Sequence, residues 1–232
     1  MSKMTSLEHQ NSTAVSARGW NEIYARGEDS NEEPWSNVVS FVHRFVLKNV
    51  NGPLSFLELG CGSGPNLRFA ARLGMSATGI DASDVAVEVC ETRLERDGLM
   101  ADVLHCPFGD LPFADQSFDC VVDRASLMFA DGDTLNQTVS EVHRVLKPGG
   151  HFFHNTIADD VAATLVALDM GEGSSDTEMY AKYPDFRLTS ASDLTDRFKA
   201  GWVAREVKRV ERTVFVPALD VTAEWEAVLQ KI

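Results

Sequence analysis

The sequence has few cysteines and little positive charge. Its 232 residues include four cysteines and no CxxC pair, so neither a disulfide framework nor a zinc site of paired cysteines is indicated, and free thiols in a reducing compartment are expected. Only 21 basic residues stand against 35 acidic ones, which gives a net charge of −14. A surface of this sign repels phosphate groups. The charge therefore argues against nucleic acid or an anionic membrane as the main partner.

Long apolar runs are also missing. No stretch reaches the about 18 apolar residues of a transmembrane helix, and residues 1–20 lack the apolar core of a signal peptide. We therefore expect no membrane contact and a cytoplasmic location. The composition, 44% hydrophobic and 24% charged, is that of an ordinary globular protein. A chain of this length buries roughly 70% of the surface of its unfolded form, so one domain with its own core is expected, as a monomer or homodimer.

From residue 54 onward, short apolar runs alternate with longer helical patterns, which is typical of βαβ units around a parallel sheet. The pattern predicts strands at 54–59, 76–81, 100–105, 118–124 and 151–157, and helices at 65–74, 84–97 and 133–146. Ser83 is expected to cap the second of these helices and Gly98 to stop it. Farther on, a short helix at 193–201 and an alternating strand at 202–216 are expected, whereas residues 224–232 fit a strand or a helix.

The strongest local signal is a glycine-rich turn at the end of the first predicted strand. Residues 58–64 read ELGCGSG, and Asp81 ends the second strand, 17 residues after Gly64. Neighbouring parallel strands end at the same edge of a sheet, where ligands bind and where glycines let them approach the main chain. A carboxylate at the tip of the second strand is placed to accept hydrogen bonds from both hydroxyls of a ribose, and such a charge-assisted bond contributes about 1.5–3 kcal/mol.

A glycine-rich turn followed by a distal acid fits two kinds of cofactor. The dinucleotide pattern is GxGxxG, but here the order is GxGxG, and Pro65 stands in place of the third glycine. Glu58 also brings negative charge, which disfavours a pyrophosphate and favours a cationic group. The pattern therefore favours a nucleoside with an ammonium or sulfonium tail over NAD. A tight turn with a helix cap is the structural alternative.

Four segments in order, FLELGCGSG, TGIDAS, LPFADQSFDCVV and EVHRVLKPGGHF, resemble the class I S-adenosylmethionine-dependent methyltransferases, in particular the branch that acts on small molecules. The resemblance covers residues 55–153. It implies a Rossmann-like, doubly wound, mostly parallel seven-stranded sheet with an antiparallel C-terminal strand and helices on both faces. It also implies S-adenosylmethionine as the cofactor and S-adenosylhomocysteine as the product. The cofactor-binding residues that it implies are Trp20, Tyr24, Glu58, Gly60, Cys61, Gly62, Gly64, Asp81, Ala82, Cys106, Phe108, Asp123 and Arg124.

The sequence departs from the family at the residue that holds the adenine amino group. Relatives place an aspartate shortly before the LPF triplet, where this chain has Pro107, and Asp110 directly precedes the triplet instead. Either Asp110 takes this role or main-chain groups near Cys106 and Phe108 hold adenine. We favour the second alternative.

By the same resemblance, one domain is expected in four parts: an N-terminal cap over the cofactor (1–50), a cofactor-binding core (51–157), a substrate-side insertion (158–190) and a C-terminal helix with strands (191–232). Trp20 and Tyr24, joined by Trp35, resemble the segment that folds over the cofactor; the alternative is that they only pin a helix to the sheet. Three aromatic residues of the insertion are predicted to form its own small core rather than an acceptor pocket: Tyr180, Tyr183 and Phe186.

The acceptor side of the site is expected at the tips of the fourth and fifth strands. The resemblance implies that Asp123, Arg124 and Ala125 line the cleft between methyl group and acceptor, with Arg124 bound to an acidic substrate group or to the methionine carboxylate. A hydroxyl acceptor also needs a base, and His154 and Asp123 are the candidates, although a purely structural His154 is the stronger alternative. His151 and His154 project to opposite faces of a strand, so no metal site is predicted.

These observations predict an S-adenosylmethionine-dependent methyltransferase that acts on a small-molecule acceptor by in-line displacement. A non-catalytic sensor of S-adenosylmethionine, or a subunit of a larger enzyme, is the second hypothesis, and an NAD-dependent oxidoreductase is the third. The cap and the insertion are too short to form a separate macromolecule-binding domain, so neither nucleic acid nor a membrane is expected as a partner. The charged run at 205–212 is interpreted as the solvent face of a strand.

Overall fold

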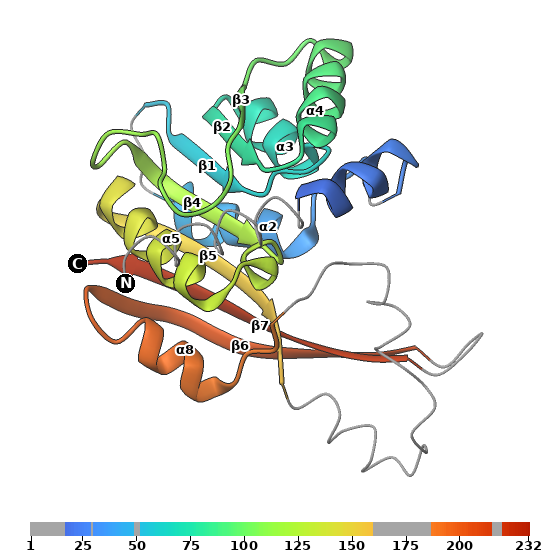
Figure 1. Ribbon diagram of the computed structural model, residues 1–232. Helices are drawn as coiled ribbons and strands as arrows, with labels where there is room; N and C mark the ends of the chain where they lie inside the picture. Colours follow the sequence, from blue (N-terminus) through green and yellow to red (C-terminus); the bar gives the residue numbers. More distant parts are fainter. Residues whose placement is uncertain (1–16, 29, 49–51, 160–186, 215–219) are drawn as a thin grey trace, which may run out of the picture.

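A single twisted sheet organises the computed structural model, which describes residues 17–28, 30–48, 52–159, 187–214 and 220–232 (Figure 1). The strand order is β3-β2-β1-β4-β5-β7-β6. The strands are β1 (Ser55–Leu59), β2 (Ser76–Asp81), β3 (Asp102–His105), β4 (Phe118–Arg124), β5 (Leu146–Ile157), β6 (Trp202–Val214) and β7 (Asp220–Lys231). Strand β7 runs antiparallel to β5 and β6, and the other neighbouring pairs are parallel. The predicted seven-stranded sheet with an antiparallel C-terminal strand is confirmed.

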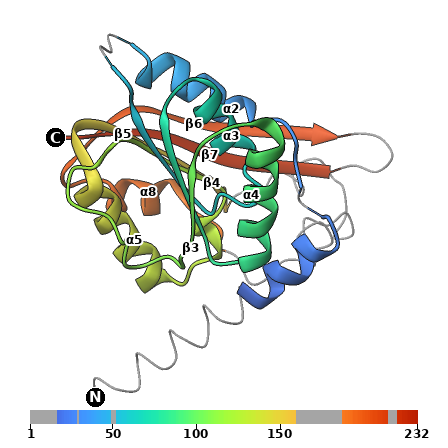
Figure 2. The ribbon, with the colours of Figure 1, turned by 90° about the horizontal axis from the view of Figure 1, so that it is seen from above.

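Helices pack on both faces of this sheet (Figure 2). They are α2 (Ser36–Phe41), which continues as the π-helical turn η1 (Val42–Val46), α3 (Pro65–Arg72), α4 (Asp84–Asp97), the 3-10 turn η2 (Leu127–Phe129), α5 (Gly132–Val145) and α8 (Ala191–Arg197), with a further helix at residues 17–25. The ends of α4 follow the prediction, because the Ser83 hydroxyl accepts a hydrogen bond from the Ala86 amide at 3.0 Å and Gly98 adopts a left-handed conformation after the last turn.

Two hydrophobic cores result from the alternation of side chains along the strands. Leu57, Leu59 and Val121 face the core that α5 and α8 cover, whereas Phe56 and Val122 face the core beneath α2, α3 and α4. Residues one apart on a strand point to opposite faces, so each buried strand carries apolar side chains on both sides. This explains why the central strands read as continuous apolar runs, and it leaves the ends of the strands as the place for polar chemistry.

The boundaries differ from the prediction at the C-terminal half. Strand β5 begins at Leu146, which pairs with Phe118, and the register then shifts so that His151 pairs with Cys120. Residues 147–150, which lie between the predicted helix and the predicted strand, therefore belong to the strand around this irregularity. The ambiguous final segment belongs to β7. The predicted insertion falls largely on residues 160–186, which lie outside the described residues together with Tyr180, Tyr183 and Phe186.

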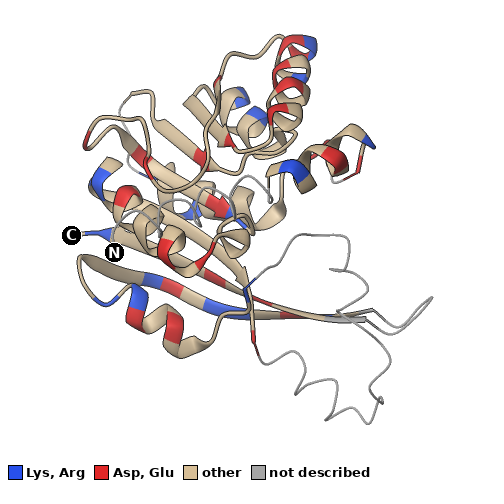
Figure 3. Cartoon of the chain, viewed as in Figure 1, with Lys and Arg blue, Asp and Glu red and all other residues tan. Residues whose placement is uncertain are grey.

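Charged side chains of both signs are interspersed over the helices and along β6 (Figure 3). The run at 205–212 lies in β6, where Arg205 and Lys208 are exposed. Its charges form ion pairs across neighbouring elements, such as Lys208 with Glu226 at 2.8 Å. Among the described residues, no helix has the length and apolar character needed to cross a membrane.

Candidate cofactor site

A cavity of about 290 Å³ opens at the carboxyl ends of β1, β2 and β4. Its walls are formed by the glycine-rich turn after β1, the tips of the neighbouring strands, and aromatic side chains from the N-terminal segment. The volume lies near the lower end of the range for small-molecule sites. The predicted residues that line it are Trp20, Tyr24, Trp35, Glu58, Gly60, Cys61, Gly62, Asp81, Ala82, Phe108, Arg124 and Ala125.

The turn after β1 presents its main chain to the cavity at two of its three glycines. Gly60 and Gly62 have φ angles of 65° and 53°, in the left-handed region. A side chain at Gly60 would collide with Ser126, and one at Gly62 would collide with the Tyr24 hydroxyl. Only glycine therefore allows the turn to lie this close to the tip of β4 and to the N-terminal helix.

Asp81 is fixed at the tip of β2 by main-chain donors. One carboxylate oxygen accepts from the Gly62 amide and the other from the Ser83 amide, both at 2.8 Å. Burial raises the pKa of Asp81 above its usual value, although these two hydrogen bonds act in the opposite direction. Each oxygen keeps a second lone pair, so the carboxylate at the cavity wall has the capacity to accept two ribose hydroxyls.

Glu58 is the most perturbed carboxyl group of the cavity wall. Its side chain is 2% exposed, Oε1 accepts from Asn66 Nδ2 at 2.7 Å, and Oε2 is buried without a hydrogen-bond partner among the described residues. Burial raises the pKa of Glu58 to about 8, with further contributions from the charges of Asp81 and Asp123. A buried, unsatisfied carboxyl oxygen at a cavity wall is suited to a cationic or hydrogen-bond-donating ligand group.

The N-terminal helix at residues 17–25 covers one side of the cavity. The Trp20 ring lies 5.0 Å from the Phe129 ring and 5.9 Å from the Tyr24 ring. The helix is joined to the tip of β2 by a hydrogen bond from the Ser83 hydroxyl to Asn21 Oδ1 at 2.5 Å. Trp20 and Tyr24 also line the cavity, so this helix forms part of the cavity wall.

Trp35 is tied to the same wall by Asn66. The Trp35 amide donates to Asn66 Oδ1 at 2.9 Å, while the amide group of that asparagine donates to Glu58. Asn66 thus links the carboxyl group of the turn to the start of α2. Asn66 directly follows Pro65 in the sequence, next to the predicted glycine-rich turn. This position could have indicated a role in the site, but Asn66 was not predicted.

Four residues predicted to bind the cofactor or to act as a base do not line the cavity: Gly64, Cys106, Asp123 and His154. Gly64 caps α3 and lies against the Cys90 thiol. The Cys106 amide donates to the Asp81 carbonyl at 2.8 Å. This hydrogen bond continues the pairing of β2 with β3, so the amide is not available to a ligand. Asp110 is exposed and accepts from Gln137, so of the residues considered in place of the missing aspartate only Phe108 lines the cavity.

Asp123 and His154 lie beneath the cavity floor, which corrects their expected position as groups facing the acceptor. They are 0% and 2% exposed, and His154 Nδ1 lies 2.6 Å from Asp123 Oδ2. The other oxygen of Asp123 accepts from the amides of Ser126 and Leu127 at 2.9 and 3.0 Å. A carboxylate can only accept, so Nδ1 carries the proton. The pair holds the turn after β4 in shape, and this turn forms part of the cavity wall.

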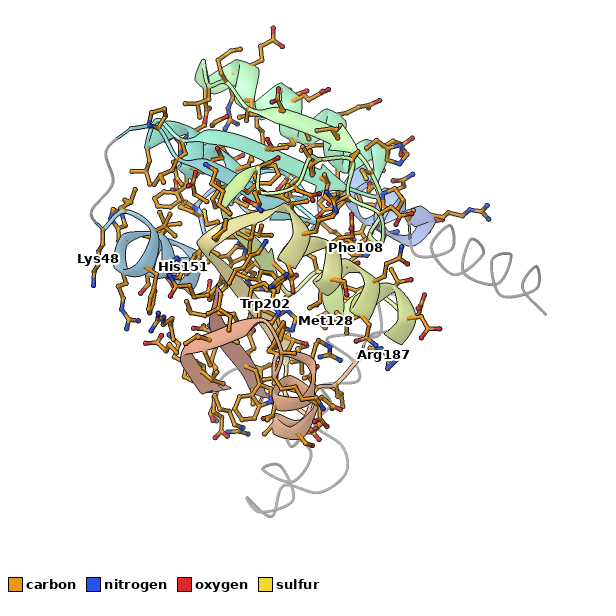
Figure 4. The ribbon with its side chains drawn as sticks, turned by 90° about the vertical axis from the view of Figure 1, so that its left-hand side faces the viewer. Lys48, Phe108, Met128, His151, Arg187 and Trp202 are labelled. Carbon is orange, nitrogen blue, oxygen red and sulfur yellow. The ribbon has the colours of Figure 1, made fainter. Side chains whose placement is uncertain are left out.

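His151 lies on the opposite face of β5, as the alternation along the strand predicts. Its ring lies 6.2 Å from that of Phe45, on the side of the molecule that carries Lys48 and away from Phe108 and Met128 (Figure 4). Within the described residues, no group of three or more His, Cys, Asp or Glu side chains is arranged to hold a metal ion.

Glu224 also lines the cavity but was not predicted from the sequence. It lies in β7, far along the chain, and reaches the cavity because β7 inserts beside β5, with Ile157 paired to Glu224. The sequence around Glu224 does not predict this position, because the pattern of residues 224–232 fits either a strand or a helix. Only the strand order brings it to the tip of β4.

Known proteins share this architecture. Residues 57–154 match a family model described as a methyltransferase domain. Over 127 residues, 53% of this chain and 45% of the relative, the sequence is 31% identical to the phthiotriol/phenolphthiotriol dimycocerosates methyltransferase of Mycobacterium tuberculosis. The chain spans less than half the length of the first curated relatives that it matches.

Solved structures with this fold include enzymes of different chemistry. The 1,6-didemethyltoxoflavin-N1-methyltransferase of Burkholderia thailandensis, solved with its substrate and S-adenosylhomocysteine, superposes with a TM-score of 0.71 at 16% identity over 96% of this chain and 90% of that chain. The cyclase SpnF superposes with a TM-score of 0.69 at 18% identity over 95% and 96%. These similarities show the fold and leave the reaction open. The matched methyltransferase domain at residues 57–154, its glycine-rich turn and the strand order are similar to those of the class I S-adenosylmethionine-dependent methyltransferases.

Proposed function

We propose that the protein binds S-adenosylmethionine in this cavity and transfers its methyl group to a small-molecule acceptor. The observation that carries the proposal is the buried Oε2 of Glu58, which has no partner among the described residues and lies at the wall where the glycine turn exposes its main chain. An ammonium group of a methionine moiety would satisfy this oxygen. Asp81, at the neighbouring strand tip, has the capacity to accept both ribose hydroxyls, and Phe108 and Ala82 flank the space for adenine.

The charges of the wall support a cationic nucleoside. Four carboxyl groups line the cavity, whereas Arg124 is the one lysine or arginine among the described lining residues. We assign Arg124 to the carboxylate of the methionine moiety, because this is the anionic group of the cofactor. The pyrophosphate of a dinucleotide would instead place two negative charges against this wall, which disfavours NAD.

When bound, the cofactor supplies a methyl group activated by its sulfonium. The part left to the chain is to hold the acceptor in line with that methyl group and to exclude water, and positioning of this kind contributes roughly 7–11 kcal/mol to catalysis. Trp20, Tyr24 and Trp35 shield the cavity from one side. Beyond Arg124 the lining continues to Met128, Ile157 and Glu224, and we assign the acceptor to this end. No histidine is among the described lining residues.

The decisive test of the cofactor assignment is Asp81→Ala. We expect the affinity for S-adenosylhomocysteine to fall by at least about tenfold, because one charge-assisted hydrogen bond is worth about 1.5–3 kcal/mol, while the fold survives. Isothermal titration calorimetry measures the affinity, and thermal unfolding checks the fold. Asp84→Ala, at an exposed carboxylate on the first turn of α4, is the matched control. Unchanged affinity in Asp81→Ala, or stabilisation of the wild type by NAD alone, would contradict the assignment.

A screen of hydroxyl, amine and thiol acceptors for S-adenosylhomocysteine formation tests the transfer step. Turnover of one class establishes the methyltransferase activity and identifies the acceptor atom. Tight cofactor binding with no turnover of any class would favour the sensor hypothesis over the enzyme.

A further inference from the structure

We infer that Glu224 binds an O–H or N–H group of the methyl acceptor, and that the acceptor is a neutral or cationic molecule with an apolar body rather than a carboxylic acid. This inference rests on the proposed function and specifies the substrate class of the same site. It depends on how Glu224 is held, on the charges around it and on a second cavity that adjoins the first.

A buried amide fixes the carboxylate of Glu224. Asn155 is 0% exposed, and its Nδ2 donates to Glu224 Oε2 at 3.0 Å and to the Trp225 carbonyl at 3.1 Å. The Glu224 side chain itself is 20% exposed and stands in β7 opposite Ile157, which also lines the cavity. A carboxylate largely withdrawn from water beside apolar side chains is costly unless its oxygens are paired. The Asn155 amide provides this pairing for one oxygen.

The second oxygen retains the capacity to bind a ligand. Oε1 lies 3.8 Å from an Arg124 guanidinium nitrogen, which is an ion pair but too long for a hydrogen bond. The guanidinium carbon of Arg124 lies 3.7 Å from the centre of the Trp35 ring. Because the guanidinium stacks on the indole, it approaches the carboxylate without closing on it. A ligand with a donor group at this end of the cavity would form a hydrogen bond to Oε1.

The surrounding charge selects against an anionic acceptor. Asp81, Asp131 and Glu224 line the cavity together with Arg124, and we have assigned Arg124 to the cofactor carboxylate. A carboxylate on the acceptor would then face Glu224 across a partly desolvated space, where like charges repel strongly. An ammonium or hydroxyl group would meet a fixed acceptor instead.

A second cavity of about 130 Å³ gives the acceptor room to extend. It shares Trp35, Arg124 and Glu224 with the first and continues along β6 and β7, where its lining is mostly polar apart from Val210. Glu224 thus stands where the two cavities meet, between the proposed reaction site and an outer groove. A group bound to Glu224 is positioned by it, while the apolar body of the acceptor packs against Trp35 and Ile157.

Three ligands of matched size test the inference: tryptamine, tryptophol and indole-3-acetate share the indole body and end in an ammonium, a hydroxyl and a carboxylate. Each is titrated by calorimetry into the protein saturated with S-adenosylhomocysteine. For the wild type we expect tryptamine and tryptophol to bind at least about tenfold more tightly than indole-3-acetate. In Glu224→Gln, tryptamine should lose at least about tenfold in affinity, while S-adenosylhomocysteine still binds.

The control is Glu211→Gln on the neighbouring strand β6, where the carboxylate pairs with Arg209 at the surface; it should leave all affinities as in the wild type. Tight binding of indole-3-acetate, binding of none of the three ligands, or unchanged tryptamine affinity in Glu224→Gln would each overturn the inference. If the wild type fails to bind S-adenosylhomocysteine, the proposed function itself is overturned. Retained cofactor binding in Glu224→Gln shows that the variant is folded.

Discussion

At the scale of single residues, we expect the buried Glu58 to couple the proposed cofactor binding to the release of a proton. Its pKa is raised to about 8, so the ligand-free protein holds this carboxyl group mostly protonated at neutral pH. A cation beside it favours the carboxylate. We therefore expect binding of S-adenosylhomocysteine to release up to one proton, and the affinity to rise by up to about tenfold per pH unit between about pH 6 and 7.5. Calorimetry in buffers of different ionisation enthalpy measures the release.

Glu58→Gln is the matched control, since it removes the ionisable group and keeps the size. It should abolish the proton release and flatten the pH dependence. Raising the pH has the opposite effect on the stability of the ligand-free protein. The folded pKa of Glu58 is higher than the unfolded value, so its stabilising contribution is present below pH 4.5 and is lost as the pH rises through about 8. Equal binding heats for the wild type in all buffers would contradict the coupling.

At the scale of elements, the Asp123–His154 pair joins β4 to β5 and fixes the turn that follows β4. Ala125 in this turn has a φ of 55°, a left-handed conformation that a non-glycine residue adopts at a cost. The hydrogen bonds to Asp123 maintain it. His154→Phe keeps the ring between Phe152 and Phe198 and removes the donor to Asp123. We expect the free energy of unfolding to fall by about 1–3 kcal/mol, as measured by chemical denaturation.

The pH–rate profile separates this positioning role from catalysis by a base. With an acceptor found in the screen, His154→Phe should lower kcat while the profile keeps its shape. His151→Phe, on the opposite face of β5, serves as the control for a histidine outside the site. Loss of one limb of the profile at unchanged stability would make His154 the base instead.

How far the sequence predicts each element depends on how local its signals are. Helix α4 was predicted to the residue because Ser83 and Gly98 mark its ends chemically. Asp81 and Glu58 were found for the same reason, since strand, turn and acid follow one another within a short span. Glu224 was not found, because its place depends on β7 inserting beside β5. Strand β5 was predicted to start too late, since periodicity does not show a register shift around Pro148.

At the scale of the whole molecule, an arginine network ties residues 30–32, which follow the N-terminal helix, to α3 and α4. Arg93 donates to the carbonyls of Ser30 and Asn31 at 3.1 and 2.7 Å, and Arg68, 3% exposed, donates to the Glu32 carbonyl at 3.2 Å. Residues 30–32 connect the helix over the cavity with α2, and Asn31 lines the cavity. The remaining ion pairs of the network join Glu32 and Asp97 to Arg68, Arg72, Arg93 and Arg96.

Breaking this network should loosen the attachment of the N-terminal helix without unfolding the sheet. Hydrogen bonding to Arg96 and the charges of the neighbouring arginines lower the pKa of Glu32 to about 2, so its contribution is present above pH 4.5 and is lost as the pH falls towards 2. In Glu32→Gln we expect faster dissociation of S-adenosylhomocysteine at neutral pH and low salt, with little change in Tm. The difference should shrink in high salt, because exposed charges are screened.

Stopped-flow tryptophan fluorescence reports the dissociation rate, since Trp20 and Trp35 line the cavity. Asp115→Asn, an exposed carboxylate paired with Arg144, is the control, and an unchanged dissociation rate in Glu32→Gln at low salt would show that the attachment of the N-terminal helix does not depend on the network.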